Sequence, residues 1–303
     1  MRGAALILAA ALAVGGCDHL IARRMVAPPN ELRQKLAGPL EPISDPKDGH
    51  LRIAVGPPAA LLSAWVGEPA GDVPVKGTVL VVHGFLADHG WMGYAAKALN
   101  KGGYRTVSVD LRGHGESTGK HITFGVVEAR DLAQLTDYLQ GHQLCGEKIG
   151  VWGVSLGAAT AIQFAGIDKR VGAVVAVAPF ASFREEVPHF ARTMMPLPGA
   201  FLSKADFAWI LARAGVIAGF DPPAADTTAA MHATQVPILL LHGDKDAIIP
   251  FANSVKLHEA GADHSELVTL HGEGHVAACF DWSGEVTKRA VPWFDRYLTG
   301  RGG

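Results

Sequence analysis

A serine flanked by two glycines lies where an apolar, β-prone run passes directly into an alanine-rich segment. The pattern is Gly153-Val154-Ser155-Leu156-Gly157, and its surroundings predict a strand, a sharp turn and a helix in that order. Side chains at the two glycine positions would obstruct the close approach of the two backbones. The pattern therefore predicts that the Ser155 hydroxyl projects from the end of a strand, where a hydroxyl can act as the nucleophile of acyl transfer.

The amide of Leu156 falls at the N-terminus of the predicted helix, where unpaired backbone N–H groups favour an anion. Such a position suits an oxyanion, the charged oxygen that forms when a hydroxyl attacks a carbonyl group. A glycine-flanked serine also arises by chance, so the interpretation depends on an acid, a base and an oxyanion loop elsewhere in the chain.

Two later segments supply candidate acids and bases, each directly after a predicted strand. The run 237–241 ends in a loop with Asp244 and Asp246, and the run 266–270 ends in a loop with His271 and His275. An imidazole can take the proton of a serine hydroxyl, and a buried carboxylate can orient and stabilise the imidazolium that forms.

Five segments together resemble the α/β hydrolases of the serine-aminopeptidase-like and monoacylglycerol-lipase-like branch, over roughly residues 60–300. The order serine, aspartate, histidine along the chain is also the one that this fold uses. The segments are His83-Gly84-Phe85, the turn Asp110-x-Arg112-Gly113-His114-Gly115-x-Ser117, the serine elbow, the loop His242-Gly243-x-x-Asp246-x-Ile248-x-Pro250, and Gly272-x-Gly274-His275.

The resemblance implies a role for each residue of the expected site. Ser155 would be the nucleophile, His275 the base and Asp246 the orienting acid. The backbone amides of Phe85 and Leu156 would hold the oxyanion. This chemistry requires neither a metal nor an organic cofactor.

The resemblance also assigns structural roles to the competing polar residues. Asp244 is interpreted as loop structure, and His271 as the end of a strand rather than the base. Asp110 and Arg112 resemble the structural turn of the family, so we expect an ion pair and hydrogen-bond clamp. Three further histidines beside turns are expected to hold loops by hydrogen bonds: His83, His114 and His242.

Apolar runs that alternate with helical patterns predict an α/β fold with a mostly parallel, doubly wound sheet and helices on both faces, the α/β-hydrolase fold. Ligands bind such sheets at the carboxyl ends of the strands, and every motif above falls at such an end. The predicted strands are 78–82, 105–110, 148–154, 172–178, 237–241 and 266–270, after a hairpin over 51–55 and 61–66; the predicted helices include 91–100, 124–140 and 285–298.

The strand pattern stops between residues 183 and 236, where methionine and aromatic residues accumulate. We expect a small helical cap over the site, inserted in a domain that spans 51–303; helices of the main core are the alternative. A peptidase acting at free N-termini would need a carboxylate pair here, and the spacing of the acidic residues picks out none. Three aromatic residues, Phe85, Trp91 and Trp282, are expected either to line a substrate pocket or to pack in the core.

The first residues resemble a bacterial lipoprotein signal. A basic start precedes an uncharged apolar run over 4–14 that is short for a membrane span, and small residues then lead to Cys17. We expect residues 1–16 to be cleaved and Cys17 to be lipidated; an ordinary signal peptide and an uncleaved anchor are the alternatives. Residues 17–50 are proline-rich and predict a tether, or an arm across the domain.

The composition fits an enzyme with a large core. The chain has 303 residues, of which 49% are hydrophobic, and a net charge of −2, which gives no electrostatic case for a nucleic-acid partner. Cys145 and Cys279 remain after the predicted cleavage, and we expect two separate thiols.

These features predict an exported serine hydrolase that cleaves small carboxylic esters through an acyl-enzyme and is held by a lipid at the periplasmic side of a membrane. A peptidase or thioesterase of the same fold remains an alternative, because these enzymes share the triad and differ in the pocket. A non-catalytic, lipid-anchored binding module is the third hypothesis. The complete set of triad residues and elbow glycines disfavours it.

Overall fold

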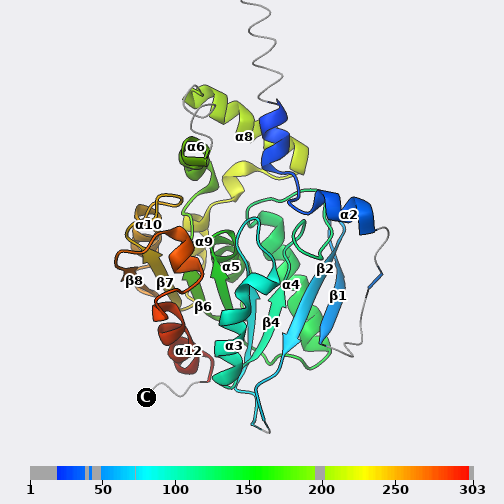
Figure 1. Cartoon of the computed structure of the whole chain (residues 1–303), viewed down its shortest axis with the longest axis vertical. Helices are drawn as coiled ribbons and strands as arrows, with labels where there is room; N and C mark the ends of the chain where they lie inside the picture. The colour runs from blue at the N-terminus through cyan, green and yellow to red at the C-terminus, as the bar shows by residue number, and fades with distance from the viewer. Residues whose placement is uncertain (1–18, 38–40, 43–48, 72, 195–201, 300–303) are drawn as a thin grey trace, which may run out of the picture.

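A sheet of eight strands forms the centre of the part of the chain that the structure describes (Figure 1). In the order β1-β2-β4-β3-β5-β6-β7-β8, β2 runs antiparallel to both of its neighbours and the other pairs are parallel. This computed structural model describes residues 19–37, 41–42, 49–71, 73–194 and 202–299. The strands are β1 (His50–Val55), β2 (Ala60–Gly67), β3 (Thr78–Val82), β4 (Arg105–Val109), β5 (Ile149–Val154), β6 (Val171–Val177), β7 (Ile238–Gly243) and β8 (Ser265–Leu270).

Each apolar run that the sequence assigns to a strand forms one. Strands β3, β5 and β7 are buried along their whole length, as expected for parallel strands covered on both faces. The predicted hairpin is formed by β1 and β2, with Leu51 opposite Ala64. The prediction of a mostly parallel sheet of the α/β class is confirmed.

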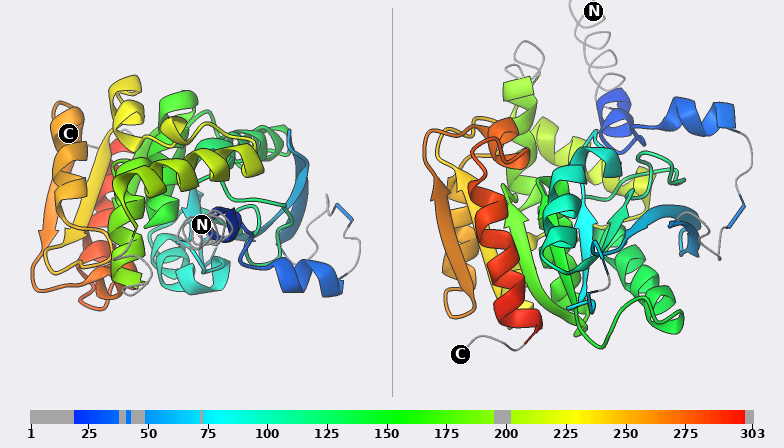
Figure 2. Two further views of the ribbon diagram at one scale, coloured as in Figure 1. Left: turned by 90° about the horizontal axis from the view of Figure 1, so that it is seen from above. Right: turned by 60° about the horizontal axis from the view of Figure 1, so that its bottom comes forward.

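Helices cover both faces of the sheet, and each face has its own apolar core (Figure 2). One core packs α3 (Gly93–Lys101) and α12 (Glu285–Leu298) against the strands. The opposite core packs α4 (Val126–Gly141) and α5 (Leu156–Ile167). Shorter helices complete the two layers: η1 (His89–Met92), α9 (Thr227–Ala233), α10 (Ala252–Ala260) and α11 (His275–Cys279).

Two helices of the predicted cap stretch follow the carboxyl end of β6, α6 (Phe183–Met194) and α8 (Lys204–Ala218) (Figure 1). On α8, Phe207 and Ile210 are buried in the adjoining core. After η2 (Pro222–Ala224), helix α9 packs on α5. The stretch therefore contains both helices beyond the end of the sheet and one helix of the main core; residues 195–201 lie outside the described residues.

The described part of the N-terminal segment lies against the domain. Residues 19–25 are helical, and α2 (Glu31–Ala37) follows. Ala22 and Val26 are fully buried in the core of the α4 and α5 face. The predicted signal 1–16 and Cys17 lie outside the described residues, within which no helix has the length and apolarity to cross a membrane.

Candidate active site

Ser155 lies at the turn between β5 and α5, where the glycine pattern places it. Its backbone has a φ of 52° and a ψ of −118°, a strained conformation for a residue with a side chain. A Cβ at Gly153 would overlap the carbonyl group of Gly157. A Cβ at Gly157 would overlap the carbonyl oxygens of Val82 and His83, so the close backbone approach requires both glycines.

The structure brings the predicted nucleophile, base and acid into one line of hydrogen bonds. The Nε2 atom of His275 is 3.1 Å from the Ser155 Oγ atom, and the Nδ1 atom is 2.6 Å from an Asp246 carboxylate oxygen. Because a carboxylate only accepts, His275 donates from Nδ1, which leaves Nε2 to accept the serine proton. The three residues come from the ends of β5, β7 and β8, which the parallel sheet brings to one edge.

The Asp246 carboxylate is buried and surrounded by donors. The backbone amides of Ile248 and Ile249 donate to one oxygen at 2.9 Å and 2.8 Å. His242 lies 3.2 Å from the other oxygen and also donates to the Ile249 carbonyl group, which fixes the loop as predicted. Burial raises the pKa of Asp246, but the hydrogen bonds from His242 and His275 outweigh it, so the pKa is lowered and the carboxylate stays ionised.

The position of His275 at the start of α11 determines its other neighbour. Cys279 is four residues further along the same helix, and its Sγ atom is 3.8 Å from the His275 Nε2 atom. Burial lowers the pKa of His275, whereas the hydrogen bond to Asp246 and the contact with Cys279 raise it. The pKa of His275 is raised overall, so its charged form is stabilised.

Asp244 and His271, the alternative acid and base, contact each other and take no part in the hydrogen bonds of Ser155, His275 and Asp246. Asp244 accepts from the Gly272 amide at 2.8 Å and lies 3.2 Å from the His271 ring. The His271 side chain is 84% exposed, and the backbone amide of Gly272 lowers the pKa of Asp244. Both residues therefore fit the structural roles expected for them.

The two predicted oxyanion amides lie on the backbone segments that border Ser155. Leu156 is the first residue of α5, so its N–H has no acceptor within the helix. Phe85 follows Gly84, at which a Cβ would lie 3.3 Å from the Ser155 Cβ atom. The loop that carries Phe85 is thus in contact with the serine.

Buried His83 connects this loop to the turn over residues 110–117, and buried His114 makes a hydrogen bond within that turn. The Leu111 amide donates to the His83 Nε2 atom at 3.0 Å, and His83 in turn donates from Nδ1 to the Gly84 carbonyl group at 2.7 Å. His114 donates to the Arg112 carbonyl group at 3.0 Å. Burial lowers the pKa of His114 to about 4, so its ring is neutral at pH 7.

The clamp expected between Asp110 and Arg112 is not formed. Arg112 makes a buried, two-pronged ion pair with Asp131 of α4, at 2.6 Å and 2.7 Å. Asp110 instead accepts from the ring and the amide of His89 and from the Glu116 amide. The chain turns at Arg112, directly after β4, so the two side chains meet different elements: Arg112 meets α4, and Asp110 meets the loop at His89.

A cavity of about 200 Å³ adjoins Ser155 and His275. Of the three aromatic residues expected at the pocket or in the core, Phe85 and Trp91 line this cavity, and Trp282 is 73% exposed. Cys145 and Cys279 are separate thiols, as expected, and Cys279 is part of the wall. The other wall residues are mostly apolar and include Leu86, Met92, Val154, Val276 and Phe280.

The acidic residues between 183 and 236 have structural partners or positions away from this wall. Glu185 pairs with a lysine of α10 at 2.8 Å, and Glu186 accepts from an asparagine of the same helix at 2.9 Å. Asp206 and Asp226 cap α8 and α9, and Asp221 precedes η2. None of the five belongs to the described cavity wall, and no cluster of three potential metal ligands occurs among the described residues.

Comparisons with known proteins agree with the fold. A family model described as serine aminopeptidase, S33, matches residues 73–212, and one described as TAP-like protein matches residues 217–290. The esterase Pf2001 of Pyrococcus furiosus superposes with a TM-score of 0.64 and 22% identity, over 84% of this chain and 96% of that one. The fold is that of the α/β hydrolases, and both family matches support membership of the α/β-hydrolase superfamily.

Two Bacillus subtilis proteins are similar in sequence. The AB hydrolase superfamily protein YisY is 28% identical over 235 residues, which cover 66% of this chain and 85% of that one. The uncharacterised protein YqkD is 32% identical over 160 residues. The match covers 52% of this chain and 51% of YqkD, so the chain spans about half the length of that relative.

Proposed function

We propose that this α/β hydrolase cleaves carboxylic esters with Ser155 as the nucleophile. The observation that carries the proposal is the position of the His275 ring, within hydrogen-bond distance of both the Ser155 hydroxyl and the buried Asp246 carboxylate. A neutral imidazole so held accepts a proton at Nε2, which turns a weakly nucleophilic hydroxyl into an effective one.

The reaction follows from these contacts. Ser155 attacks the ester carbonyl carbon while its proton passes to the His275 Nε2 atom, and Asp246 stabilises the imidazolium. The amides of Phe85 and Leu156 bind the oxyanion of the tetrahedral intermediate, a contribution of about 3 kcal/mol per donor in such sites. The intermediate expels the alcohol, which takes the proton from His275. A water molecule, deprotonated by the same ring, then attacks the acyl-enzyme; the Ser155 oxygen leaves with the proton from His275, and the carboxylic acid is released.

The size and lining of the cavity beside Ser155 favour a substrate with a small acyl group. Its volume of about 200 Å³ is close to that of protein cavities, roughly 150 Å³, that hold one benzene ring. Apolar walls favour an alkyl or aryl group without charge. The esterase neighbour supports the same substrate class through its fold.

The description of one family model suggests a second substrate class, amides at a free N-terminus. A cationic amine bound near Ser155 would need a carboxylate partner, and the described cavity wall contains none. The wall therefore favours esters or thioesters over aminoacyl amides.

The test compares Ser155→Ala with Ser283→Ala, a change at an exposed serine. We expect Ser155→Ala to lose hydrolysis of short p-nitrophenyl esters by at least about 10³-fold with unchanged unfolding, and Ser283→Ala to keep it. A panel of esters, thioesters and aminoacyl amides ranks the substrate classes. Unchanged ester hydrolysis in Ser155→Ala, or no fluorophosphonate adduct on Ser155, would instead favour a binding module.

We also propose that the protein is exported and held on the periplasmic side of a membrane by a lipid on Cys17. The basic start, the apolar run over 4–14 and the small residues before the cysteine support this processing. Mass spectrometry of the mature N-terminus tests it; an unmodified Cys17 inside the mature chain would disprove it.

A further inference from the structure

The outward face of α8 is exposed and carries apolar side chains beside one arginine. Trp209, Ala212, Arg213 and Val216 have the spacing i, i+3, i+4 and i+7, so they form one stripe along the helix. Trp209 is 45% exposed and Val216 is 72% exposed. The opposite side of α8 already packs in the core, so the outer stripe has no role in holding this helix to the domain.

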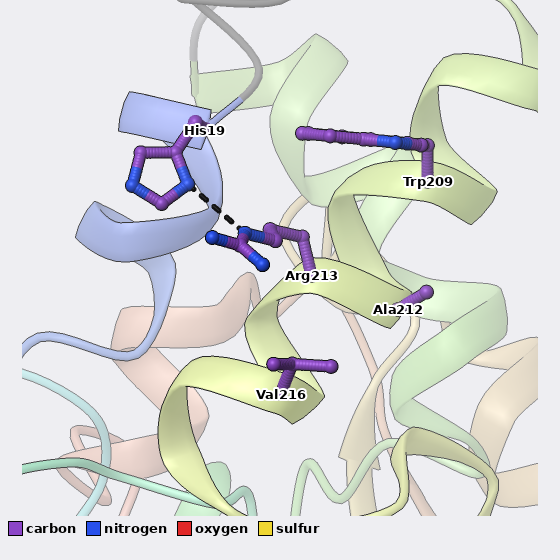
Figure 3. A pocket seen from close by; sticks show the side chains of 5 residues that line it. All are labelled: His19, Trp209, Ala212, Arg213 and Val216. Atoms are coloured by element: carbon purple, nitrogen blue, oxygen red, sulfur yellow. Dashed lines mark hydrogen bonds between the residues drawn. The ribbon is translucent and has the colours of Figure 1, made fainter.

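The N-terminal helical residues extend this stripe into a wider surface (Figure 3). The Arg213 Nε atom donates to the His19 Nδ1 atom at 3.1 Å, and the two residues line a shallow hollow of about 450 Å³ together with the α8 stripe. Leu20, the next residue, is 57% exposed. We call the surface formed by His19, Trp209, Ala212, Arg213 and Val216 the docking face.

The charges in and beside the docking face are mainly basic. Arg23 and Arg24 are exposed on the N-terminal helical residues, and Lys204 is exposed at the start of α8. The acidic residue of the first turn of α8, Asp206, accepts from the backbone of Ser203 and thereby caps the helix. Exposed tryptophan and aliphatic side chains beside arginines and lysines suit the boundary between the headgroups and acyl chains of an anionic bilayer.

The chain itself brings this face to a membrane. Cys17 is two residues before His19, so its α-carbon can be at most about 7 Å from that of His19. A lipid on Cys17 would insert in the bilayer and hold His19 and Leu20 next to the headgroups.

We propose that the docking face lies on the surface of an anionic phospholipid bilayer, with Trp209 and Val216 inserted at the level of the headgroups. The proposal rests on the anchoring proposed above and is independent of the ester chemistry. It fixes the orientation of the domain, because contact is made by a face rather than by one flexible point.

The experiment reads the environment of Trp209 in the full-length protein, purified from membranes and reconstituted in vesicles of phosphatidylcholine and phosphatidylglycerol. Part of the phosphatidylcholine carries bromine near the top of its acyl chains, which quenches tryptophans at that depth. The difference in emission between the unchanged protein and Trp209→Phe gives the emission of Trp209. The same difference for Trp293→Phe gives the emission of a buried tryptophan of α12, which is the control.

We expect brominated lipid to remove about half or more of the Trp209 emission and to leave the Trp293 emission unchanged. Arg213→Glu should restore much of the Trp209 emission, because it repels anionic headgroups, while the matched change Arg296→Glu on α12 should not. Vesicle-bound protein without Trp209 quenching would overturn the docking face and leave the anchor intact. Protein that does not sediment with the vesicles would overturn both, and ester hydrolysis in the same samples reports on the proposed reaction separately.

Discussion

The two ring nitrogens of His275 have different partners, and this difference fixes the state of the ring. The Nδ1 proton is committed to Asp246, so only Nε2 can exchange a proton with Ser155. Asp246 is in turn held by two backbone amides and by His242. The Asp246 carboxylate is therefore already oriented without a substrate, which would remove one reorganisation step from the proposed reaction.

The pH dependence of ester hydrolysis should reflect the raised pKa of His275. The base must be neutral, so activity rises with pH through that pKa, and the acid limb of kcat/KM should lie above the ordinary histidine value of about 6.5. Asp246→Asn removes the carboxylate that raises the pKa, so the limb should move to lower pH while kcat falls by about 10⁴-fold. Asp244→Asn is the matched control and should change neither; an unshifted limb in Asp246→Asn would contradict the assignment.

Met92 should set the length of the acyl group that the cavity accepts. It is 1% exposed and lines the cavity, so Met92→Ala should enlarge the space and shift preference toward longer p-nitrophenyl esters. The loss of buried contacts should lower the free energy of unfolding by about 2–5 kcal/mol.

The control for Met92→Ala is Met231→Ala, because Met231 is fully buried in the core of the opposite face. It should lose similar stability without a change in chain-length preference. If both variants keep the original preference, the cavity does not hold the acyl group.

Residue-level predictions succeeded where the sequence motif itself contains the contact. His242 holds its loop as expected, because it donates to the Ile249 carbonyl group seven residues further along the same motif. Arg112 shows the opposite case, because its partner Asp131 lies on α4 with no spacing rule to connect the two. The contact of Cys279 with His275 was accessible in principle, since the spacing i, i+4 indicates it once a helix is predicted at that position.

Among the elements, the turn between β5 and α5 is the most tightly constrained. Its helix begins directly against the end of β3, so α5 approaches the backbone at Val82 and His83 closely enough to exclude any side chain at Gly157. This approach also brings the loop after β3 next to Ser155. This close approach therefore positions both Ser155 and the loop that carries the Phe85 amide.

Gly157→Ala should damage this arrangement far more than an ordinary helix substitution. The added Cβ would overlap backbone carbonyl groups, which cannot rotate away, so ester hydrolysis should fall by at least about 100-fold. Gly141→Ala, at the end of α4, adds the same methyl group in open space and should leave hydrolysis unchanged. Comparable activities of the two variants, measured on folded protein, would contradict this account.

Strands β3, β5 and β7 were predictable because burial on both faces leaves continuous apolar runs, which few other elements produce. Helices α10 and α11 were not predicted. Each has nine residues or fewer, which is too short for a clear helical pattern. Each also follows a loop motif, and the sequence was interpreted there through the motif alone. The position of α9 in the main core was also not evident, because it depends on packing against α5.

At the scale of the whole molecule, residues 19–37 of the N-terminal segment pack against the folded domain. The Asn30 side chain donates to the carbonyl groups of Gly115 and Ser117, at 3.0 Å and 2.7 Å. These residues belong to the turn whose residue Asp110 accepts from the loop at His89. A continuous set of contacts therefore leads from the N-terminal segment to the loop that borders Ser155.

Asn30→Ala should weaken the attachment of this segment. Two partly buried carbonyl groups would lose their donor, which should reduce the free energy of unfolding by about 1–3 kcal/mol in urea titrations. Lys35→Ala, on the adjoining helix α2, removes only an exposed ion pair with Glu31 and should cost clearly less stability. Equal losses would show that the contacts of Asn30 do not hold the segment.

Because residues 19–37 pack against the domain, only a short length of chain would separate a lipid on Cys17 from the domain. A long flexible linker would let an enzyme sweep a large volume and meet soluble substrates at a distance. With the proposed lipid on Cys17, the reach would be restricted to the immediate neighbourhood of that residue, and the supply of substrate would depend on lateral diffusion within the bilayer plane. Inserting a flexible spacer between residues 17 and 19 would separate these two modes of encounter without touching the reacting groups.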